Sequence, residues 1–357
     1  MSAFEPIAII GQGCVLPGAH SPDELWQAVA AGADLTARAS SEDWGIDIAR
    51  VTATPGADTT DRCWNHQGGY VRGFEQSFDP DRFRIDRDQV AGLDSGVQWC
   101  LHAAREALLS AGMEPFTRTR DDVGVILGNL AYAPRSMQDY TARYWLSQAH
   151  RESAPSPFTR HAPADLAAIT TPAAQRFFSA AAPAQLTARA IGAGGDALCL
   201  DAACASSLYA IRLACEQLQD GRARLMLAGA LNHADDLYLH IGFTALQALT
   251  RNGVARPFDQ RADGLVPGAG AAIVVLKRLT DARQDGDNVL GVIRGIGLSN
   301  DGRSGGFLSP SREGQVEAIS RAYRQCDVNP DQISYLECHA TGTSAATSRS
   351  RRASTRG

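Results

Sequence analysis

The chain has 357 residues, of which 44% are hydrophobic and 20% are charged, as in an ordinary folded water-soluble protein. Its formal net charge is −5, from 34 basic and 39 acidic residues, so the charge favours neither nucleic acid nor an anionic membrane surface as the main partner. No run of about 18 uncharged apolar residues is present, which argues against a membrane span. The N-terminus lacks a basic segment followed by an apolar one, and we therefore expect no signal peptide.

Eight cysteines are present and none has CxxC spacing, so the sequence contains no zinc or redox motif of that type. Cysteines without a pairing pattern are typical of the reducing cytoplasm, where most of them pack as small hydrophobic side chains. We therefore predict a cytoplasmic protein.

Apolar strands alternate along the chain with amphipathic helices. The predicted strands cover residues 5–10, 123–127, 197–203, 225–230, 271–276, 289–296 and 333–338, and the predicted helices cover 96–111, 206–218 and 312–326. This alternation predicts an α/β fold with a largely parallel sheet. Residues 130–183 are rich in proline and aromatic residues, which indicates an irregular segment with short helices.

An early helix is predicted to begin after Ser21, with Pro22 at its first position and Glu24 closing a capping box. The side chains expected on its apolar face are Leu25, Trp26, Val29 and Ala30.

Glycine-rich turns are predicted after two of the strands, at residues 11–13 and 295–297. Their similarity hints at an internal duplication. The first turn opens like a dinucleotide-binding fingerprint, but Leu16 stands where the third glycine belongs. Close packing is therefore the better explanation for these glycines.

Cys204 lies between a predicted strand and the start of a predicted helix, in the stretch Leu-Asp-Ala-Ala-Cys-Ala-Ser-Ser-Leu. Free backbone N–H groups at a helix N-terminus favour negative charge, and a sharp turn there would expose the sulfur. The pattern is typical of a nucleophile. Taken alone, it fits a packed cysteine beside small residues equally well.

His339 closes the last predicted strand and is followed by Ala-Thr-Gly-Thr. A histidine there can point into a site at the carboxyl end of the strand, where open α/β sheets bind ligands. On its own, such a histidine is more often a hydrogen-bonded polar residue than a catalyst.

Together these two stretches resemble the β-ketoacyl synthase family, the condensing enzymes with a thiolase-like fold. The resemblance extends to the opening segment at residues 5–19, the central loop at residues 256–264 and the segment at residues 299–311. It covers nearly all of residues 5–343, and residues 130–183 match least. Within the family, the sequence looks closest to synthases of polyketide or polyunsaturated fatty-acid assembly lines.

The resemblance implies a thiolase-like, layered αβαβα fold whose C-terminal half is incomplete. Residues 1–280 would form the N-terminal ketosynthase region that carries the nucleophile, and residues 281–343 the start of the C-terminal region. Residues 344–357, which are rich in arginine and serine and hold no large apolar side chain, would form a disordered tail. The family forms homodimers through a strand near the nucleophile, which would place residues 196–203 close to the two-fold axis.

The resemblance also implies an acyltransferase that catalyses decarboxylative Claisen condensation in fatty-acid or polyketide biosynthesis. Cys204 would accept an acyl group from the phosphopantetheine arm of an acyl carrier protein, and its own backbone N–H would help to stabilise the oxyanion. His339 would assist decarboxylation of a malonyl-type thioester and stabilise the enolate. Thr341 and Thr343 match positions that contact the pantetheine arm. Neither a metal nor a cofactor of its own is implied.

The chain departs from the family pattern in three places. Ala269 stands where the family usually has glutamate, and residues 93–98 lack the usual Asp-Pro-Gln motif. After Thr343 the family continues with a Gly-Asp pair, a lysine, a second catalytic histidine and a Gly-Phe-Gly turn that completes the oxyanion hole. The break at this point is typical of a truncation or a shifted reading frame. We therefore expect that the chain alone does not complete the condensation.

Several motifs favour other functions less strongly. Residues 302–306 satisfy the GxSxG pattern of serine hydrolases, but a loop-like stretch follows where a helix belongs. Asp259 and Asp263 flank Arg261, an arrangement that favours turn and salt-bridge roles over a paired-carboxylate site. His233 and His240 have no metal-ligand spacing, and we interpret them as surface or packing residues.

Three functional hypotheses follow from the sequence. The chain is a condensing acyltransferase, a non-catalytic thiolase-fold protein that binds a carrier or partner subunit, or a truncated remnant without a function of its own. Cys204 argues against the second hypothesis, and the missing second histidine argues for it.

Overall fold

A six-stranded mixed sheet lies at the centre of the fold. The computed structural model describes residues 4–54, 56–130, 180–234, 237–302, 310–326 and 328–343. The sheet has the strand order β5-β4-β6-β7-β1-β8. Its strands are β1 (Ile7–Val15), β4 (Val123–Asn129), β5 (Ala197–Leu200), β6 (Leu225–Asn232), β7 (Gly270–Arg278) and β8 (Gly291–Ile293), and a separate small sheet pairs β2 (Ala37–Arg38) with β3 (Gln67–Gly68).

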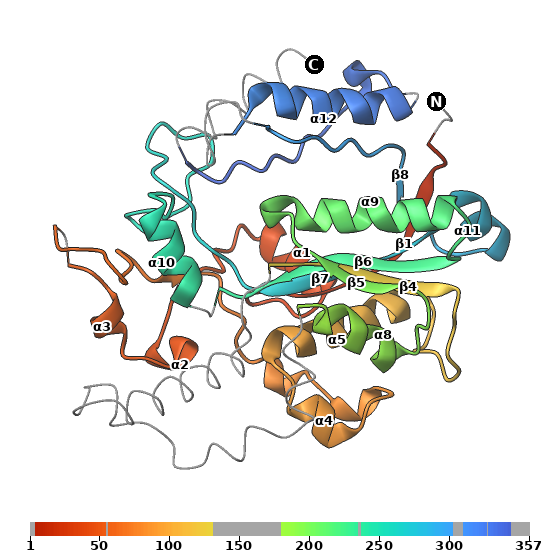
Figure 1. Cartoon of the computed structure of the whole chain (residues 1–357), viewed down its shortest axis with the longest axis horizontal. Coiled ribbons are helices and arrows are strands. Elements are labelled where there is room, and N and C mark those ends of the chain that lie inside the picture. Colours follow the sequence, from red (N-terminus) through yellow and green to blue (C-terminus); the bar gives the residue numbers. More distant parts are fainter. Residues whose placement is uncertain are drawn as a thin grey trace.

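Helices form layers on both faces of the central sheet. Figure 1 shows α9 above the sheet, α5 and α8 below it, and α12 as a further layer beyond α9. The helices are α1 (Pro22–Ala30), α2 (Ser41–Trp44), α3 (Ile48–Val51), α4 (Arg87–Ala91), α5 (Ser95–Ser110), α8 (Ala182–Ile191), α9 (Ser206–Gln219), α10 (Leu237–Ala245), α11 (Leu279–Asp285) and α12 (Arg312–Gln325), with short 3-10 helices at residues 74–76, 80–82, 203–205 and 330–332. The result is a layered α/β fold, as the sequence predicts.

The central strands are buried on both faces, which explains their continuous apolar sequence. In β4, Val125 and Leu127 pack in the cluster on the side of α5 and α8, whereas Ile126 packs in the cluster on the side of α9. All three side chains are fully buried. The neighbouring strand β6 alternates in the same way, with Leu227 on the first side and Met226 on the second.

The prediction of a largely parallel sheet is wrong. β4 is parallel to β5 and β6, but β7 is antiparallel to β6, and β1 is antiparallel to both β7 and β8. Two neighbouring parallel strands need a connection that runs back from the end of the first strand to the opposite end of the sheet, where the second strand starts. The segment between β6 and β7 makes no such return, since Asn232 at the end of β6 pairs with Gly270 at the start of β7. The two strands are therefore antiparallel.

Gly11 and Gly13 lie inside β1 and not in a turn after it, which corrects the sequence-based prediction. A Cβ on Gly11 would lie 2.1 Å from the carbonyl oxygen of Ala107, and one on Gly13 would lie 2.2 Å from that of Ala103. Both alanines belong to α5. The glycines therefore let the helix backbone pack directly against the strand, which is the close packing that the sequence favours over a dinucleotide site.

The second glycine pair makes the same contact with a different helix. A Cβ on Gly295 would lie 2.6 Å from the carbonyl oxygen of Ala322, and one on Gly297 would lie 1.8 Å from that of Ala318, both in α12. The spacing of glycines and alanines is the same as between β1 and α5. This repeated contact supports the internal duplication suggested by the sequence.

The layer between α9 and α12 contains extended chain that forms no strand. Residues 294–301 and 333–341 have no assigned strand, so the predicted strand at 289–296 shrinks to β8, and the one at 333–338 is wrong. The first segment is held by side chains of α12: Arg321 donates to the Leu298 carbonyl at 2.7 Å, and Gln325 accepts from Ile296 N–H at 3.0 Å. A strand needs a neighbour for its backbone groups, and an apolar pattern alone cannot provide one.

The start of α1 is as predicted, but its apolar face is not buried. Ser21 accepts a hydrogen bond from Glu24 N–H at 3.3 Å, whereas the Glu24 carboxylate accepts from His20 N–H instead of closing a capping box on Ser21. Trp26 is 70% exposed and Val29 is 61% exposed. No described segment covers this apolar face. The periodicity of the sequence predicts that the helix has such a face but not whether another segment packs on it.

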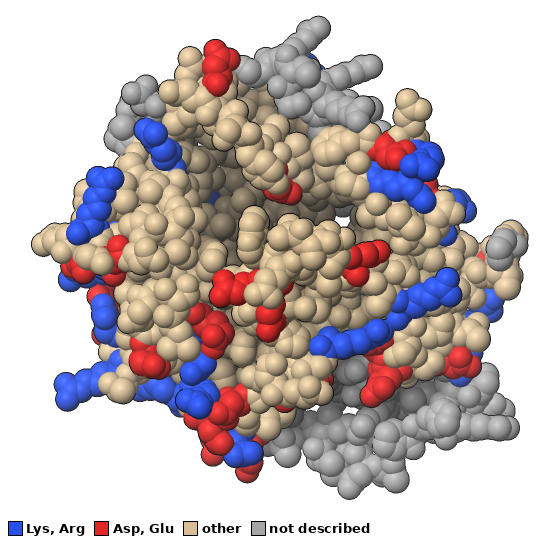
Figure 2. Space-filling model, turned by 180° about the vertical axis from the view of Figure 1, so that it is seen from behind, with Lys and Arg blue, Asp and Glu red and all other residues tan. Residues whose placement is uncertain are grey.

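Some of the sequence predictions lie outside the described residues. They include the irregular structure predicted for 130–183, apart from residue 130 and residues 180–183, and the disorder of 344–357. Within the described ranges, no helix is long and apolar enough to cross a membrane. Figure 2 shows basic and acidic side chains interspersed over the face opposite to that of Figure 1.

Candidate functional site

Three parallel strands, β5, β4 and β6, have their carboxyl ends side by side. The predicted nucleophile follows the outermost of them, β5. Gly128 in β4 lies opposite Leu200 at the end of β5, and Asn129 lies opposite Leu231 near the end of β6. Sites in open α/β sheets commonly lie beyond the carboxyl ends of such strands. Cys204 occupies that position.

Cys204 is exposed in a tight turn between β5 and α9. It lies in a short 3-10 helix at residues 203–205, and α9 continues directly from it. The preceding residue, Ala203, has a positive φ of 51°, a conformation that residues with a Cβ seldom adopt. The turn thus presents the thiol at the N-terminus of a 14-residue helix, where backbone N–H groups favour developing negative charge.

Side chains on both sides of Cys204 hold this turn. The hydroxyl of Ser206 accepts from Ala202 N–H at 2.8 Å and donates to the Ala203 carbonyl at 2.6 Å. The Asp201 carboxylate accepts from Ala203 N–H at 2.9 Å. Sequence reasoning missed the contribution of Ser206, because its only signal is a serine at a helix start.

The segment with the predicted pantetheine contacts is anchored near the start of β7. Gly264 N–H donates to the carbonyl of Gly342 at 3.1 Å. Gly342 has a φ of 85°, and a Cβ there would lie 2.8 Å from the Gly264 carbonyl oxygen, so the contact requires glycine. Thr341 and Thr343 are half-buried, and their hydroxyl oxygens lie 3.4 Å apart.

His339 lies in the extended segment just before this anchor, and its ring is exposed. Gly264, which holds the segment through Gly342, leads into β7, and β7 begins beside the carboxyl end of β6. The segment that contains His339 therefore reaches the carboxyl ends of the parallel strands, where Cys204 also lies. Among the described residues, however, no hydrogen bond joins the Cys204 thiol to the His339 ring. The roles of Cys204, His339, Thr341 and Thr343 therefore stay predictions.

The carboxylates of the central loop have structural roles, as predicted. Asp259 pairs with Arg261 at 2.8 Å, and this hydrogen-bonded ion pair holds the pKa of the Asp259 carboxyl well below its usual value. Asp263 accepts from the Thr250 hydroxyl at 2.7 Å and from the Asn252 amide at 2.9 Å. The GxSxG serine at residue 304 lies outside the described residues.

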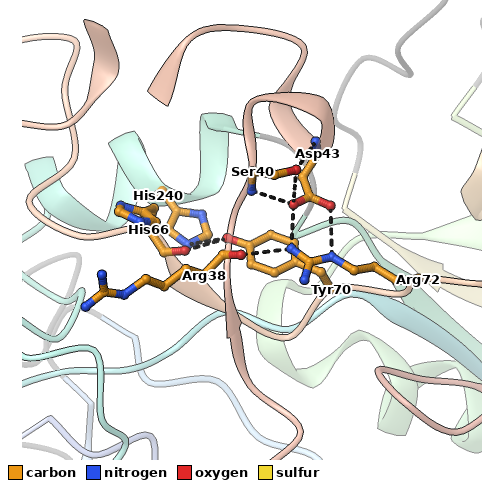
Figure 3. A network of polar contacts seen from close by, with 7 residues as sticks. All are labelled: Arg38, Ser40, Asp43, His66, Tyr70, Arg72 and His240. Carbon is orange, nitrogen blue, oxygen red and sulfur yellow. Dashed lines mark hydrogen bonds and ion pairs between the residues drawn. The ribbon is translucent and has the colours of Figure 1, made fainter. Parts of the chain in front are cut away.

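His233 and His240 are packing residues, also as predicted. His233 lies 5.2 Å from the Trp99 ring and 3.5 Å from the Asp94 carboxylate. Its ring fills the space that a Cβ on Gly96 would need. His240 is fully buried between Trp44 and Tyr70, in the polar network shown in Figure 3.

Comparison with known protein families decides the identity of the chain. The family model of the β-ketoacyl synthase N-terminal domain matches residues 4–282, and that of the C-terminal domain matches residues 290–348. The chain belongs to the β-ketoacyl synthase family. The C-terminal match extends into the first residues of the segment predicted to be a tail.

Relatives of this β-ketoacyl synthase chain include large polyketide synthases. It is 33% identical over 340 residues to a component of the phenolphthiocerol/phthiocerol polyketide synthase of Mycobacterium tuberculosis, covering 95% of this chain and 17% of that protein. It is 31% identical to the pikromycin polyketide synthase component PikAIII of Streptomyces venezuelae, covering 95% of this chain and 20% of that protein. The chain therefore spans about a fifth of the length of these curated relatives.

Solved ketosynthase structures share the fold of the chain. The PfaC keto synthase–chain length factor superposes with a TM-score of 0.82 at 36% identity, covering 98% of this chain and 37% of that one. The ketosynthase from module 6 of the bacillaene synthase of Bacillus subtilis superposes with a TM-score of 0.76 at 25% identity, covering 98% and 53%. The expected thiolase-like α/β fold is thereby confirmed.

Proposed function

We propose that this chain contributes the acyl-accepting nucleophile, Cys204, to β-ketoacyl synthase chemistry in polyketide biosynthesis. The observation that carries the proposal is the turn between β5 and α9, which exposes one thiol at a helix N-terminus. The polyketide synthases among its relatives support the pathway class.

In the first half-reaction, the Cys204 sulfur attacks the carbonyl carbon of an acyl thioester on a carrier protein. The new C–S bond forms as the old one breaks, and the carrier thiol leaves with the proton that the Cys204 thiol gives up. The oxyanion of the tetrahedral intermediate would accept a hydrogen bond from Cys204 N–H, which the positive φ of Ala203 orients at the start of α9.

In the second half-reaction, a malonyl-type thioester loses carbon dioxide. The electron pair of the broken C–C bond forms an enolate, and His339 would donate a hydrogen bond to the enolate oxygen. In the family's reaction the enolate carbon then attacks the acyl carbonyl on the nucleophilic cysteine, a C–C bond forms, and the cysteine thiolate leaves. Thr341 and Thr343, half-buried beside the Gly342–Gly264 contact, would bind the pantetheine arm of the carrier.

The proposed assembly is a homodimer formed through β5. This strand lies at the edge of the six-stranded sheet, and its four residues are only half-buried. Edge strands present unpaired backbone groups that a second copy can pair with. A chain that sediments as a monomer at micromolar concentration would contradict this assembly. The eight unpaired cysteines support a reducing, cytoplasmic location.

The release of carbon dioxide from a malonyl group on a carrier protein tests this function, because a protein that only binds carriers does not catalyse it. We expect release by the wild-type chain and a loss of at least about tenfold in His339→Ala, since one catalytic hydrogen bond contributes this much or more. His339→Gln, which keeps a hydrogen-bond donor, should retain more activity.

His20→Ala is the matched control, since His20 lies at the start of α1, and it should release carbon dioxide at the wild-type rate. Carrier binding without release would contradict the proposal and support the carrier-binding protein instead. Equal release by His339→Ala and the control would remove His339 from the mechanism.

A further inference from the structure

Ser206, the first residue of α9, closes the backbone around Cys204 with its side chain. Its hydroxyl bonds to Ala202 N–H on one side of the turn and to the Ala203 carbonyl on the other, at 2.8 and 2.6 Å. The residue is only 5% exposed. Water therefore cannot easily replace either bond if the hydroxyl is removed.

The two bonds hold a backbone conformation that the sequence does not favour by itself. Ala203 has a φ of 51°, and the left-handed region is unfavourable for any residue with a Cβ. Without the hydroxyl, the turn could relax to a negative φ at Ala203. Such a change would rotate the next residue, Cys204, and its backbone N–H.

The position of Ser206 is fixed in turn by β4. A Cβ on Gly128 would lie 2.7 Å from the Cβ of Ser206 and 3.0 Å from the backbone nitrogen of Ser207. Glycine at the end of β4 therefore lets α9 begin directly against the strand. β4 thus contacts Ser206, and the Ser206 hydroxyl is hydrogen-bonded to the turn that presents the Cys204 thiol.

We propose that Ser206 is a positioning residue that sets the orientation of the Cys204 thiol by holding Ala203 in its left-handed conformation. The inference rests on the proposed acyl-accepting role of Cys204 and names the group that prepares it. Ser206 acts through the backbone and does not contact the acyl group.

The rate constant for alkylation of Cys204 by iodoacetamide, followed by peptide mass spectrometry, tests this role. The reaction needs a well-presented thiol but neither a carrier protein nor condensation. Ser206→Ala should slow alkylation by about tenfold, the effect of losing roughly one hydrogen bond. Ser207→Ala, at the half-buried neighbouring position, is the matched control and should react within about twofold of wild type.

A double variant tests whether Ser206 acts by positioning the backbone at Ala203 or only by stabilising the fold. Ala203→Gly added to Ser206→Ala should restore the rate to within about threefold of wild type, because glycine adopts a positive φ without strain. A folded Ser206→Ala protein that reacts at the wild-type rate, or a slow double variant, would overturn the proposal. Normal alkylation of the wild type without acyl transfer from a thioester would overturn the proposed function and leave the positioning role standing.

Discussion

Burial determines the protonation state of His240. Its Nε2 atom lies 3.1 Å from the Gln67 carbonyl and 3.3 Å from the Tyr70 hydroxyl, so the neutral ring carries its proton on Nε2. The Nδ1 atom is buried without a partner among the described residues. A second proton there would create a buried charge without an acceptor, and burial accordingly lowers the pKa of His240 from 6.5 to about 4.

This lowered pKa predicts a loss of stability in weak acid. The unfolded chain takes up the proton near pH 6.5, whereas the folded chain does so only near pH 4, so the free energy of unfolding falls across this interval, by on the order of 3 kcal/mol. His240→Gln should show a smaller difference between urea midpoints at pH 7 and pH 5. His339→Gln, at an exposed position, should keep the wild-type difference. The same difference between the urea midpoints at pH 7 and pH 5 in both variants would show that His240 does not cause the loss of stability.

At the scale of elements, the contact between β1 and α5 depends on glycine. A Cβ on Gly13 would lie 2.2 Å from the Ala103 carbonyl oxygen and 2.7 Å from the Ala107 backbone nitrogen. Both atoms belong to a helix backbone and cannot move aside as a flexible side chain could. The strand and helix would have to separate, and the fully buried side chains between them would lose contacts.

We therefore expect Gly13→Ala to reduce the free energy of unfolding by about 1–3 kcal/mol or more, the usual cost of overpacking. The matched control is Gly242→Ala in α10, where a Cβ would have nothing within 4 Å. Alanine there should be neutral or stabilise by about 0.5–1 kcal/mol, because it favours the helix. Unfolding in denaturant measures the free energy of unfolding of both variants. A Gly13→Ala change that leaves this free energy unaltered would contradict the close contact between β1 and α5.

The sequence predicts helices better than strands for a physical reason. The ends of α5, α9 and α12 lie within one residue of the predicted ends, because capping and a 3.6-residue period are local properties. β1 is longer than predicted, since its glycines resemble a turn until the helix behind them is known. The segment at 333–338 has a strand-like pattern, but Tyr335 is 76% exposed and no strand forms there.

At the scale of the whole molecule, the strand order joins segments that are far apart in the sequence. β7 lies between β6 and β1, and no local pattern predicts such a pairing. The position of Cys204 was predictable, because a strand, a cysteine and a helix start follow one another. The support of its turn by Ser206 and Gly128 was not, since it depends on the close approach of β4. The contact between Gly342 and Gly264 likewise joins distant segments.

The central claim is that Cys204 accepts the acyl group, and peptide-level mass spectrometry after incubation with an acyl-pantetheine thioester tests it most directly. We predict one acyl group on the peptide that contains Cys204, and none in Cys204→Ala, because the other cysteines of the described chain are buried or half-buried. Cys326→Ala, which removes a half-buried thiol at the end of α12, should be acylated like the wild type. An acyl group on another cysteine, or none on the folded protein, would contradict the account.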